Sequence, residues 1–517
     1  MEPTLGVVLT SIVVAASITC FVKLVNLVWL RPRKLEKLLR SQGLHGNPYR
    51  PILGDTKDFA ATNQAEKLRS IQLSDHILPH IFGYFHTILN NYGPNSFLWF
   101  GPWPRLNVVD PELIREILNK ADVYHKPLPE MGKILTGGLV VLEGQKWAKH
   151  RKIVNPAFHI HKLKNMVPAI VLSCSNMISK WEAMVSGSDK GWCEIDVWPF
   201  LEDLAGDVIS RTAFGSSHEE GTRIFQLQKE KLEMSFPLLQ LIIIPGWRYL
   251  PTKANRRLRA ITTQVQSLLR GIIEKRQNGM SRGDDLLGLL MESNSGIIQE
   301  HGNKKAAGMS IEDVIEECKL FYFAGSETTS SLLVWTMLLL CLHPDWQTRA
   351  REEVNRVLGK CSEPTFEDLN HLKTVTMILQ EVLRLYPPLP LTARGPTETV
   401  KLGNLTIPKG VHMTLLIGQV HYDPEIWGED AREFKPQRFA EGIPQSAKIK
   451  SAFIPFGSGP RACIGQHLAM IEAKVAIAMI LRSFSFELSP AYVHAPFAVL
   501  TLQPQYGAPM ILRTLQS

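Results

Sequence analysis

The first residues of this chain contain an apolar stretch that constrains the fold before anything else, because it suits a membrane. Residues 4–22 (TLGVVLTSIVVAASITCFV) carry no charge, and after Lys23 the apolar sequence resumes as far as Leu30. About 20 apolar residues of a helix span the hydrocarbon core of a bilayer, and a lysine near one end can extend its amine to the headgroups. A cleaved signal peptide would need a basic start and a shorter apolar region, whereas this start carries Glu2. The pattern predicts an uncleaved membrane anchor over residues 1–30.

Basic residues follow the anchor and set its orientation. Residues 31–40 contain five basic side chains against one acidic residue, Glu36. Because a basic flank stays on the cytosolic side of the membrane, we expect the rest of the chain to face the cytosol. Glycines and prolines then gather between residues 43 and 54, and they resist a continued helix. The sequence predicts a basic, Pro/Gly-rich hinge over residues 31–55 and one large domain over residues 56–517.

Composition excludes several classes of protein. The 517 residues are 45% hydrophobic and 21% charged, which rules out a disordered chain, a collagen-like chain and a polytopic membrane protein. The net charge of +8 fits an anionic membrane surface or an acidic partner protein as well as it fits nucleic acid. The seven cysteines are scattered and contain no C-x-x-C pair, so we expect neither a disulfide framework nor a structural zinc site.

The longest expected helix opens at Ser310. Ser310 and Asp313 match the capping-box pattern, and the apolar-rich run that follows continues to Leu342, where His343 and Pro344 end it. About 30 residues make a helix roughly 45 Å long, enough to cross a whole domain. Since nearly every turn of such a helix would be buried, polar residues at its centre need an explanation.

Helical periodicity dominates residues 110–390, whereas β-branched or proline-punctuated pieces at residues 400–410 and 498–503 predict small sheets. The expected fold class is mainly α with small β-sheets, preceded by one N-terminal transmembrane helix.

Residues 456–465 (FGSGPRACIG) combine a glycine-rich turn with an arginine and a cysteine. The glycines let the backbone approach a flat ligand, and Arg461 suits a carboxylate. Cys463 precedes a helix expected from Ile464, whose amides and positive end favour a thiolate. The residues also fit the dinucleotide pattern G-x-G-x-x-[GA], but that pattern needs an acidic residue about 20 positions on, where Arg482 stands. A buried structural cysteine after a turn is a third interpretation.

The same ten residues fill F-x-x-G-x-R-x-C-x-G at every specified position, so this segment resembles the heme-thiolate loop of cytochrome P-450 enzymes. The resemblance implies that Phe456, Arg461 and Cys463 bind heme b and that the Cys463 thiolate is the axial ligand of its iron. Trp147 and Arg151, one helical turn apart, are similar to the family's W-x-x-x-R, whose indole and guanidinium bind heme propionates.

The centre of the long helix also matches the family. Residues 324–329 (AGSETT) fill [AG]-G-x-[DE]-T-[TS]. The resemblance implies that Gly325 leaves room for dioxygen and that Glu327 and Thr328 deliver protons. Taken alone, the residues equally suit a glycine kink with Thr328 bonded to its own backbone.

Two further segments are similar to the family's E-x-x-R and F-x-P-x-R-F. The resemblance implies a structural network of Glu381, Arg384 and Arg438 that holds the Cys463 loop, although E-x-x-R alone is a commonplace surface pair. The lysines beside Trp147 form either a solvated helix face or a basic docking surface: Lys146, Lys149 and Lys152. We assign His150 no role.

The resemblance extends over most of the chain, and phrases such as NPYRPILGD and FYFAGSETT are similar to plant clan-72 members, particularly the 72A-type terpenoid oxidases. It implies that residues 56–517 form a heme-thiolate monooxygenase that hydroxylates a lipophilic molecule, a terpenoid or triterpenoid, at the endoplasmic reticulum membrane. Since the sequence carries no convincing NADPH or flavin site, electrons from NADPH would arrive through NADPH–cytochrome P-450 reductase.

Two alternatives remain. One is a heme-thiolate isomerase or dehydratase, against which the intact Glu327–Thr328 pair argues; the other is a non-catalytic heme-binding membrane protein, which would not consume NADPH. By family analogy, mainly apolar stretches line the substrate pocket: residues 127–139, 232–242, 321–324, 389–393 and 497–501.

Overall fold

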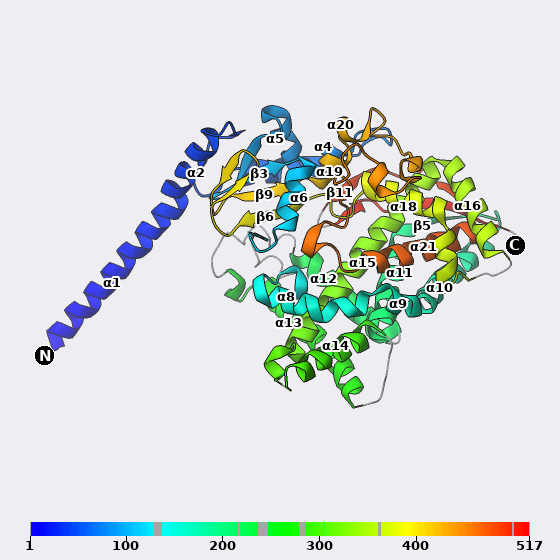
Figure 1. Ribbon diagram of the computed structural model, residues 1–517, viewed down its shortest axis with the longest axis horizontal. Helices are drawn as coiled ribbons and strands as arrows, with labels where there is room; N and C mark the ends of the chain where they lie inside the picture. The colour runs from blue at the N-terminus through cyan, green and yellow to red at the C-terminus, as the bar shows by residue number, and fades with distance from the viewer. Residues whose placement is uncertain are drawn as a thin grey trace. The chain divides into compact units, whose positions relative to one another are not determined.

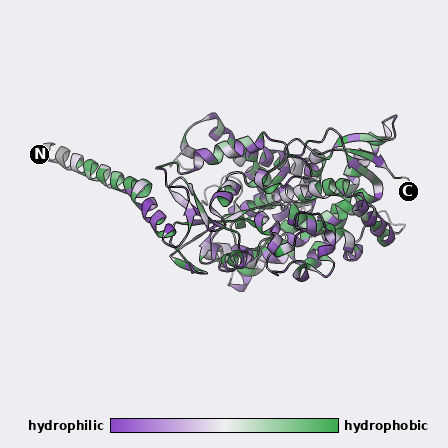
Figure 2. Cartoon of the chain, turned by 90° about the horizontal axis from the view of Figure 1, so that it is seen from above, coloured by the Kyte–Doolittle hydropathy of each residue, from purple (hydrophilic) through white to green (hydrophobic). Residues whose placement is uncertain are grey.

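The N-terminal segment is helical as far as Arg40. It consists of α1 (Glu2–Val25), a π-helical turn η1 (Asn26–Leu30) and α2 (Arg31–Arg40). Between Leu9 and Arg40, the most apolar 18-residue window has a mean hydropathy of 2.0 and no buried residue. Figure 2 shows the described part of α1 as almost wholly hydrophobic and the helix after it as hydrophilic. The segment is therefore a candidate membrane span, as predicted.

The computed structural model describes residues 2–127, 137–215, 218–235, 247–278, 285–302, 304–359, 363–498 and 501–515. The chain divides into two compact units. Unit 1 comprises Met1–Arg69, His76–Pro127 and Leu391–Leu416, and unit 2 comprises Ser70–Asp75, Leu128–Pro390 and Ile417–Ser517. The boundaries expected at residues 30 and 55 separate a membrane anchor, a hinge and a large domain. The two compact units do not test these boundaries, which stay a prediction.

Unit 1 is built on a six-stranded mixed sheet. Its strands follow the order β1 (His45–Gly46), β2 (Ser96–Phe100), β3 (Trp103–Val108), β9 (His412–Leu415), β6 (Thr392–Pro396) and β4 (Tyr124–His125). The unit also contains α3 (Thr56–Lys67), α4 (Leu78–Phe82), α5 (Tyr84–Tyr92), α6 (Pro111–Asn119) and the hairpin of β7 (Val400–Leu402) and β8 (Leu405–Ile407). Phe97, Leu98 and Trp99 of β2 are fully buried, so this strand forms the centre of the unit's core.

A tight turn at residues 50–54 contains the one strained residue of the described chain. Ile52 is the only described non-glycine residue with a positive φ, 67°. A β-branched side chain in this left-handed region costs about 1–3 kcal/mol. The turn is closed by the Gly54 amide, which donates to the Arg50 carbonyl at 2.8 Å, and by the Tyr49 hydroxyl, which accepts from the Ile52 amide at 3.2 Å. Neighbouring bonds thus hold Ile52 in a conformation that its own side chain disfavours.

Unit 2 is mainly helical, with two small antiparallel sheets (Figure 1). Its longer helices are α8 (Gly144–Val154), α10 (Val167–Ser186), α11 (Val197–Phe214), α12 (His218–Ser235), α13 (Lys253–Gln277), α14 (Leu286–Glu300), α15 (Ile311–Leu342), α16 (Pro344–Leu358), α18 (Lys373–Leu385) and α21 (Gln466–Ser483). The sheets are β10 (Phe484–Leu488), β13 (Pro509–Thr514) and β5 (Cys193–Asp196), and β11 (Pro496–Ala498) with β12 (Leu502–Pro504). The predicted fold class, mainly α with small sheets, is confirmed.

Helix α15 is the central element of unit 2, and it packs against α11, α18 and α21 (Figure 1). Ser310 caps its first turn: the Ser310 hydroxyl accepts from the Asp313 amide at 3.1 Å, and the Asp313 carboxylate accepts from the Ser310 amide at 3.3 Å. The helix ends at Leu342, and Pro344 starts α16. The predicted cap and end of this helix are confirmed.

We expect Ile52→Gly to raise the free energy of unfolding by about 1 kcal/mol, because glycine adopts a positive φ without strain. Ile52→Ala is the matched control: it also removes the exposed side chain but keeps a Cβ in the left-handed region. Urea unfolding of the detergent-solubilised protein measures both variants. Equal stabilities of the two variants would show that the turn stores no strain.

Candidate functional site

A tight loop presents Cys463. The Cys463 amide donates to the Phe456 carbonyl at 2.8 Å, and the Gly457 amide donates to the Ile454 carbonyl at 3.0 Å. Gly457 and Gly459 have φ of 69° and 68°, which other residues rarely adopt, and a Cβ at Gly457 would meet nothing within 4 Å. The glycines therefore make the turn and leave open space beside its backbone. Helix α21 then begins at Gln466 rather than at the expected Ile464.

The Cys463 side chain is exposed, although the surrounding protein desolvates its thiol. This burial raises the pKa of Cys463, whereas hydrogen bonds from the Gly465 and Gln466 amides and the charge of Arg151 act to lower it. These three groups would stabilise a thiolate, and a cation bound to the sulfur would displace its proton. The geometry suits a metal-ligating thiolate better than an inert buried cysteine.

Arg461 lies beside Trp147 of α8. Its guanidinium carbon is 4.4 Å from the centre of the indole ring, and its Nη2 donates to the Leu142 carbonyl at 2.9 Å and pairs with Glu143. Arg461 Nε and Nη1 are buried and have no hydrogen-bond partner among the described residues. Two orphaned nitrogens of a buried guanidinium suit an incoming carboxylate. Heme carries two carboxylates, so these residues fit the cofactor that the sequence predicts.

The centre of α15 borders open space at a few positions. Between Glu317 and Leu340 every residue is buried except four, which lie within two turns: Phe323, Ala324, Gly325 and Thr328. The Thr328 hydroxyl donates to the Ala324 carbonyl at 2.7 Å. This is the backbone bond expected of a structural threonine, but Thr328 is only partly buried, and a hydroxyl oxygen that donates one hydrogen bond can still accept another.

Gly325 has a neighbour that the sequence did not predict. A Cβ at Gly325 would lie 2.8 Å from Cδ1 of Ile209 on α11. The glycine therefore allows α11 and α15 to pack closely. The expectation that its small size also leaves room for dioxygen stays a prediction.

Glu327 is buried and points to the β12 region. Its Oε2 accepts from Gln503 Nε2 at 2.8 Å and from the Thr501 hydroxyl at 3.3 Å. Burial, and next the charge of Glu202, raise the pKa of Glu327 to about 7, while Lys229 acts in the opposite direction. A carboxyl group with this pKa both holds and releases a proton near neutral pH.

The predicted network of Glu381, Arg384 and Arg438 is present. Arg384 Nε and Nη2 each lie 2.7 Å from a carboxylate oxygen of Glu381, and both side chains are fully buried. Arg438 Nε is 3.4 Å from Glu381, and Arg384 Nη1 donates to the carbonyls of His421 and Ala431 at 2.7 and 2.6 Å. The pair is therefore a buried structural brace and not a surface ion pair.

His421 connects this network to the Cys463 loop, a link that sequence reasoning missed. Its Nδ1 lies 3.1 Å from the Arg384 carbonyl, and its Nε2 accepts from the Ile454 amide at 3.2 Å. Burial, and next Arg384, lower the pKa of His421 to about 3, so the ring is neutral and can donate from Nδ1. Since Ile454 itself bonds to Gly457, the brace reaches the first glycine of the loop.

His150, to which the sequence assigned no role, is a second missed contact. Its Nδ1 lies 2.6 Å from Glu317 Oε1, and both side chains are buried. Glu317 Oε2 accepts from the Leu139 amide at 3.0 Å. Because His150 lies next to Arg151 and one turn from Trp147, this bond fixes the part of α8 that carries both residues.

The lysines of α8 are partly engaged within unit 2. Lys146 pairs with Asp313 at 2.8 Å, and Lys149 donates to the Gly308 carbonyl at 2.9 Å. Both contacts join α8 to the start of α15. Lys146 and Lys149 thus have contacts within unit 2, and the choice between a solvated face and a docking surface stays open for all three lysines.

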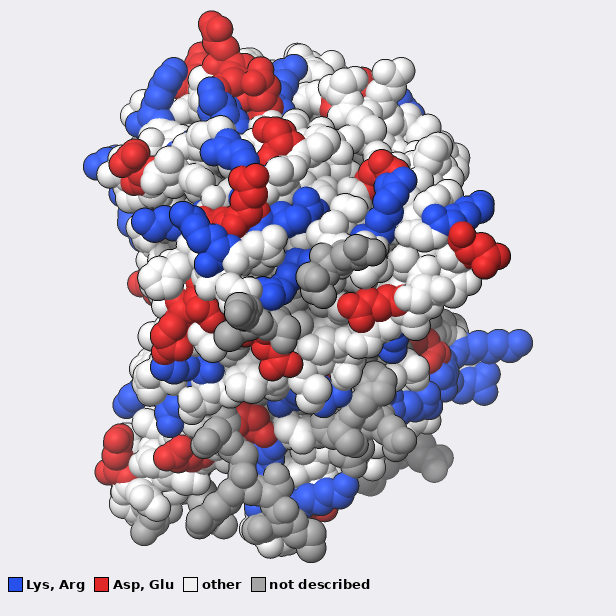
Figure 3. Space-filling view, turned by 90° about the vertical axis from the view of Figure 1, so that its right-hand side faces the viewer, with Lys and Arg blue, Asp and Glu red and all other residues white. Residues whose placement is uncertain are grey.

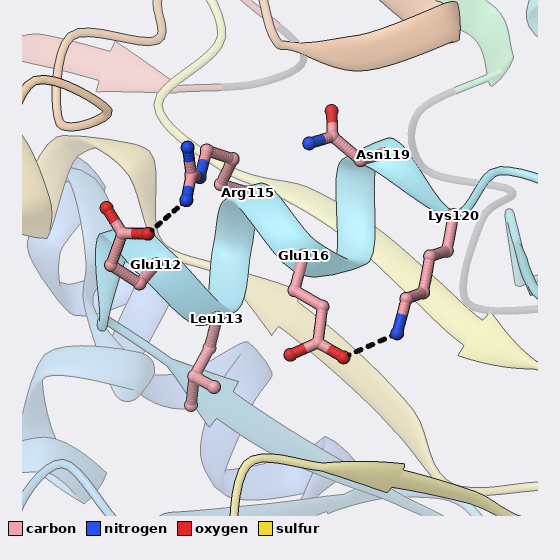
Figure 4. Close-up of a pocket in the computed structure, with 6 residues that line it drawn as sticks. All are labelled: Glu112, Leu113, Arg115, Glu116, Asn119 and Lys120. Atoms are coloured by element: carbon pink, nitrogen blue, oxygen red, sulfur yellow. Dashed lines mark hydrogen bonds and ion pairs between the residues drawn. The ribbon is translucent and has the colours of Figure 1, made fainter.

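Parts of three of the five expected substrate-contacting stretches, residues 128–136, 236–242 and 499–500, lie outside the described residues. A hollow on α6, in unit 1, is shown in Figure 4. Its charged side chains pair along the helix, Arg115 with Glu112 at 2.7 Å and Lys120 with Glu116 at 2.8 Å. It is an ordinary solvated helix face.

Comparison with known proteins decides the family. The family model described as cytochrome P-450 matches residues 71–505. The chain belongs to the cytochrome P-450 family. Cytochrome P-450 CYP72A219 of Panax ginseng is 53% identical over 499 residues, covering 95% of this chain and 96% of that protein. Cytochrome P-450 72A397 of Kalopanax septemlobus is 50% identical, covering 99% and 100%, and 72A13 of Arabidopsis thaliana is 50% identical, covering 94% and 95%.

Membership of the cytochrome P-450 family makes the chain a heme monooxygenase, with an N-terminal helix that suits a membrane anchor. Within the described residues, no three His, Cys, Asp or Glu side chains cluster as a metal site. Heme carries its own iron, so a single cysteine ligand from the protein suits it.

The raised pKa of Glu327 predicts a pH-dependent stability. A carboxyl whose pKa is about 7 when folded and 4.5 when unfolded binds its proton more tightly in the folded state. Its stabilising contribution is present below pH 4.5 and is lost as the pH rises to 7. The free energy of unfolding of Glu327→Gln, taken relative to that of the native chain, should therefore be up to about 3 kcal/mol higher at pH 8 than at pH 4.

Urea unfolding at both pH values measures this difference. The control is Glu312→Gln on the same helix, an exposed residue whose pKa is lowered by backbone hydrogen bonding, so its replacement cannot raise stability at high pH. A Glu327→Gln variant with the same pH dependence as the native chain would contradict the raised pKa.

Proposed function

We propose that this protein is a single-pass heme-thiolate monooxygenase of the endoplasmic reticulum membrane that hydroxylates a terpenoid or triterpenoid. Its catalytic domain would face the cytosol and receive electrons from NADPH through NADPH–cytochrome P-450 reductase. The observation that carries the proposal is the arrangement of Cys463, an exposed residue whose sulfur lies near two helix-start amides and a guanidinium.

Each residue of the site has a role in this proposal. The Cys463 thiolate would hold the heme iron, and Phe456 would fix the loop through its carbonyl. Trp147, Arg151 and Arg461 would bind the carboxylates of the cofactor. When bound, heme with a thiolate ligand activates dioxygen for insertion into a C–H bond.

Glu327 and Thr328 would move protons in this site. The pKa of about 7 lets Glu327 hold a proton at neutral pH and release it when needed. Thr328 is partly buried and is one of the residues at which α15 borders open space. Lys229 and Glu202 pair at 2.9 Å and act on Glu327 in opposite directions, since Glu202 raises the pKa of Glu327 and Lys229 lowers it.

The proposed substrate class and the proposed redox partner are supported by the composition and charge of the sequence. The stretches expected to line the pocket are mainly apolar, and this favours a bulky lipophile; the choice of a terpenoid rests on the likeness to 72A-type oxidases. The net charge of +8 suits an acidic flavoprotein partner. On the face drawn in Figure 3, basic and acidic side chains are interspersed. Five basic residues after the anchor support a cytosolic orientation.

The proposal is tested with full-length protein in microsomes with reductase. We expect a thiolate-type carbon monoxide spectrum and NADPH-dependent hydroxylation of at least one compound of a terpenoid panel. Cys463→Ala should abolish both, whereas the matched Cys193→Ala should keep both. An unchanged spectrum in Cys463→Ala would contradict the proposed ligand. Conversion without NADPH would favour an isomerase or dehydratase, and heme binding without any conversion would favour a non-catalytic protein.

We expect Thr328→Ala to keep heme and NADPH oxidation but to release peroxide in place of most of the product. Thr336→Ala is the control, because the Thr336 hydroxyl makes the same bond, 2.7 Å to the Leu332 carbonyl, but is fully buried. Product yield per NADPH, measured in both variants, separates proton delivery from helix stabilisation. Full coupling in Thr328→Ala would assign this threonine a structural role alone.

A further inference from the structure

Glu143 lies directly before helix α8 and pairs with the buried guanidinium of Arg461. Its carboxylate contacts Arg461 Nη2, the same nitrogen that donates to the Leu142 carbonyl at 2.9 Å. Of the two side chains, 4% of Arg461 and 20% of Glu143 are exposed. An ordinary surface ion pair leaves both charged groups in water, whereas this pair holds a guanidinium that has left it. The contact therefore belongs to the interior of the site.

Glu143 is also tied to the helical turn that carries Trp147. Its backbone is extended, with φ of −132° and ψ of 163°, and its carbonyl accepts from the Trp147 amide at 3.4 Å. Arg461 closes the ring of contacts, since its guanidinium carbon lies 4.4 Å from the centre of the Trp147 ring. Glu143, Trp147 and Arg461 thus support one another, and the loss of the Glu143 carboxylate would release one side of Arg461.

The contacts of Arg461 divide its nitrogens between the protein and an incoming group. Nη2 is used by Glu143 and the Leu142 carbonyl, whereas Nε and Nη1 are buried and have no hydrogen-bond partner among the described residues. A buried donor without a partner is costly, so we expect a bound group to fill these two positions. With Nη2 fixed, the guanidinium keeps a single orientation, and Nε and Nη1 remain available to a carboxylate.

The pair also places a negative charge where the cofactor brings two more. Burial lowers the pKa of Arg461, Glu143 acts to raise it, and the charge of Arg151 acts to lower it. Two guanidiniums are therefore close enough to interact, and Glu143 is the carboxylate that pairs with one of them. When a heme carboxylate binds Arg461, a single guanidinium separates it from Glu143. A negative charge at this range in a desolvated site opposes the addition of an electron to the heme.

We propose that Glu143 is a positioning residue of the heme site, which holds Arg461 in the orientation that receives a heme carboxylate and lowers the reduction potential of the bound heme. The inference rests on the heme binding in the proposed function. The two effects have different physical origins: the first needs a hydrogen-bond acceptor at position 143, and the second needs its negative charge. Glutamine keeps the acceptor without the charge, and alanine removes both.

The test uses the full-length holoenzyme and measures two quantities that do not depend on turnover. A spectroelectrochemical titration gives the midpoint potential, and transfer of heme to excess apomyoglobin gives the rate of heme release. We expect a more positive potential in both Glu143→Gln and Glu143→Ala. We expect heme release several-fold faster than native in Glu143→Ala. In Glu143→Gln it should be no faster than native, because the hydrogen bond to Arg461 is kept.

The matched control is Glu230→Gln. Glu230 of α12 pairs with Arg257 of α13 at 2.6 Å, and both side chains are exposed. This variant removes the same charge and weakens an ion pair away from Arg461, so we expect the native potential and the native rate of heme release. A shift of the potential in Glu230→Gln as large as that in Glu143→Gln would show that net charge alone acts, and would overturn the proposal.

The remaining outcomes separate this inference from the proposed function. If the reduced native protein gives no thiolate-type carbon monoxide spectrum, the proposed function fails and the inference fails with it. If that spectrum is present but both Glu143 variants keep the native potential, or Glu143→Ala releases heme no faster than native, the inference alone is overturned. If Glu143→Ala does not fold, the potential of Glu143→Gln decides, because a purely structural glutamate would leave it unchanged.

Discussion

The buried ion pair of Glu381 and Arg384 is the interaction on which the irregular part of unit 2 depends. Two charges removed from water are costly unless every donor and acceptor is satisfied. Arg384 meets this condition because, besides Glu381, it donates to the carbonyls of His421, Ala431 and Glu433. Those carbonyls belong to short helical turns and loops, which have few backbone partners of their own.

The same brace explains how the Cys463 loop keeps its shape. His421 receives its orientation from the Arg384 carbonyl and offers its other nitrogen to Ile454. A neutral, fully buried imidazole with one donor and one acceptor position is suited to join two backbones. The charge network and the sulfur are thus connected through backbone hydrogen bonds, and the loop does not rely on its own turn alone.

Signals that are local in the sequence predicted the structure well. The capping box of Ser310 and Asp313, the end of α15 and the tight turn before Cys463 all depend on residues within a few positions of one another. The missed contacts join distant residues. Glu317 meets His150, 167 positions away, and Glu327 meets Gln503, 176 positions away. A single sequence gives no signal for such pairs, because each residue alone suits many partners. The close packing of Gly325 was missed for the same reason: its neighbour Ile209 lies on another helix.

The division of the chain into two discontinuous units has a consequence for its synthesis. Unit 1 needs residues 391–416, and unit 2 needs residues 417–517, which include Cys463 and α21. A chain that leaves the ribosome from its N-terminus exposes the anchor first; it can complete unit 1 only after residue 416 has emerged, and unit 2 only after the last fifth of the chain has emerged. The membrane therefore captures the nascent chain long before its cofactor loop exists, and apolar core surface stays uncovered during that interval. Chaperones would meet a tethered, open polypeptide during that interval, and a premature stop codon soon after Cys463 would remove α21, β10 and β13 from unit 2.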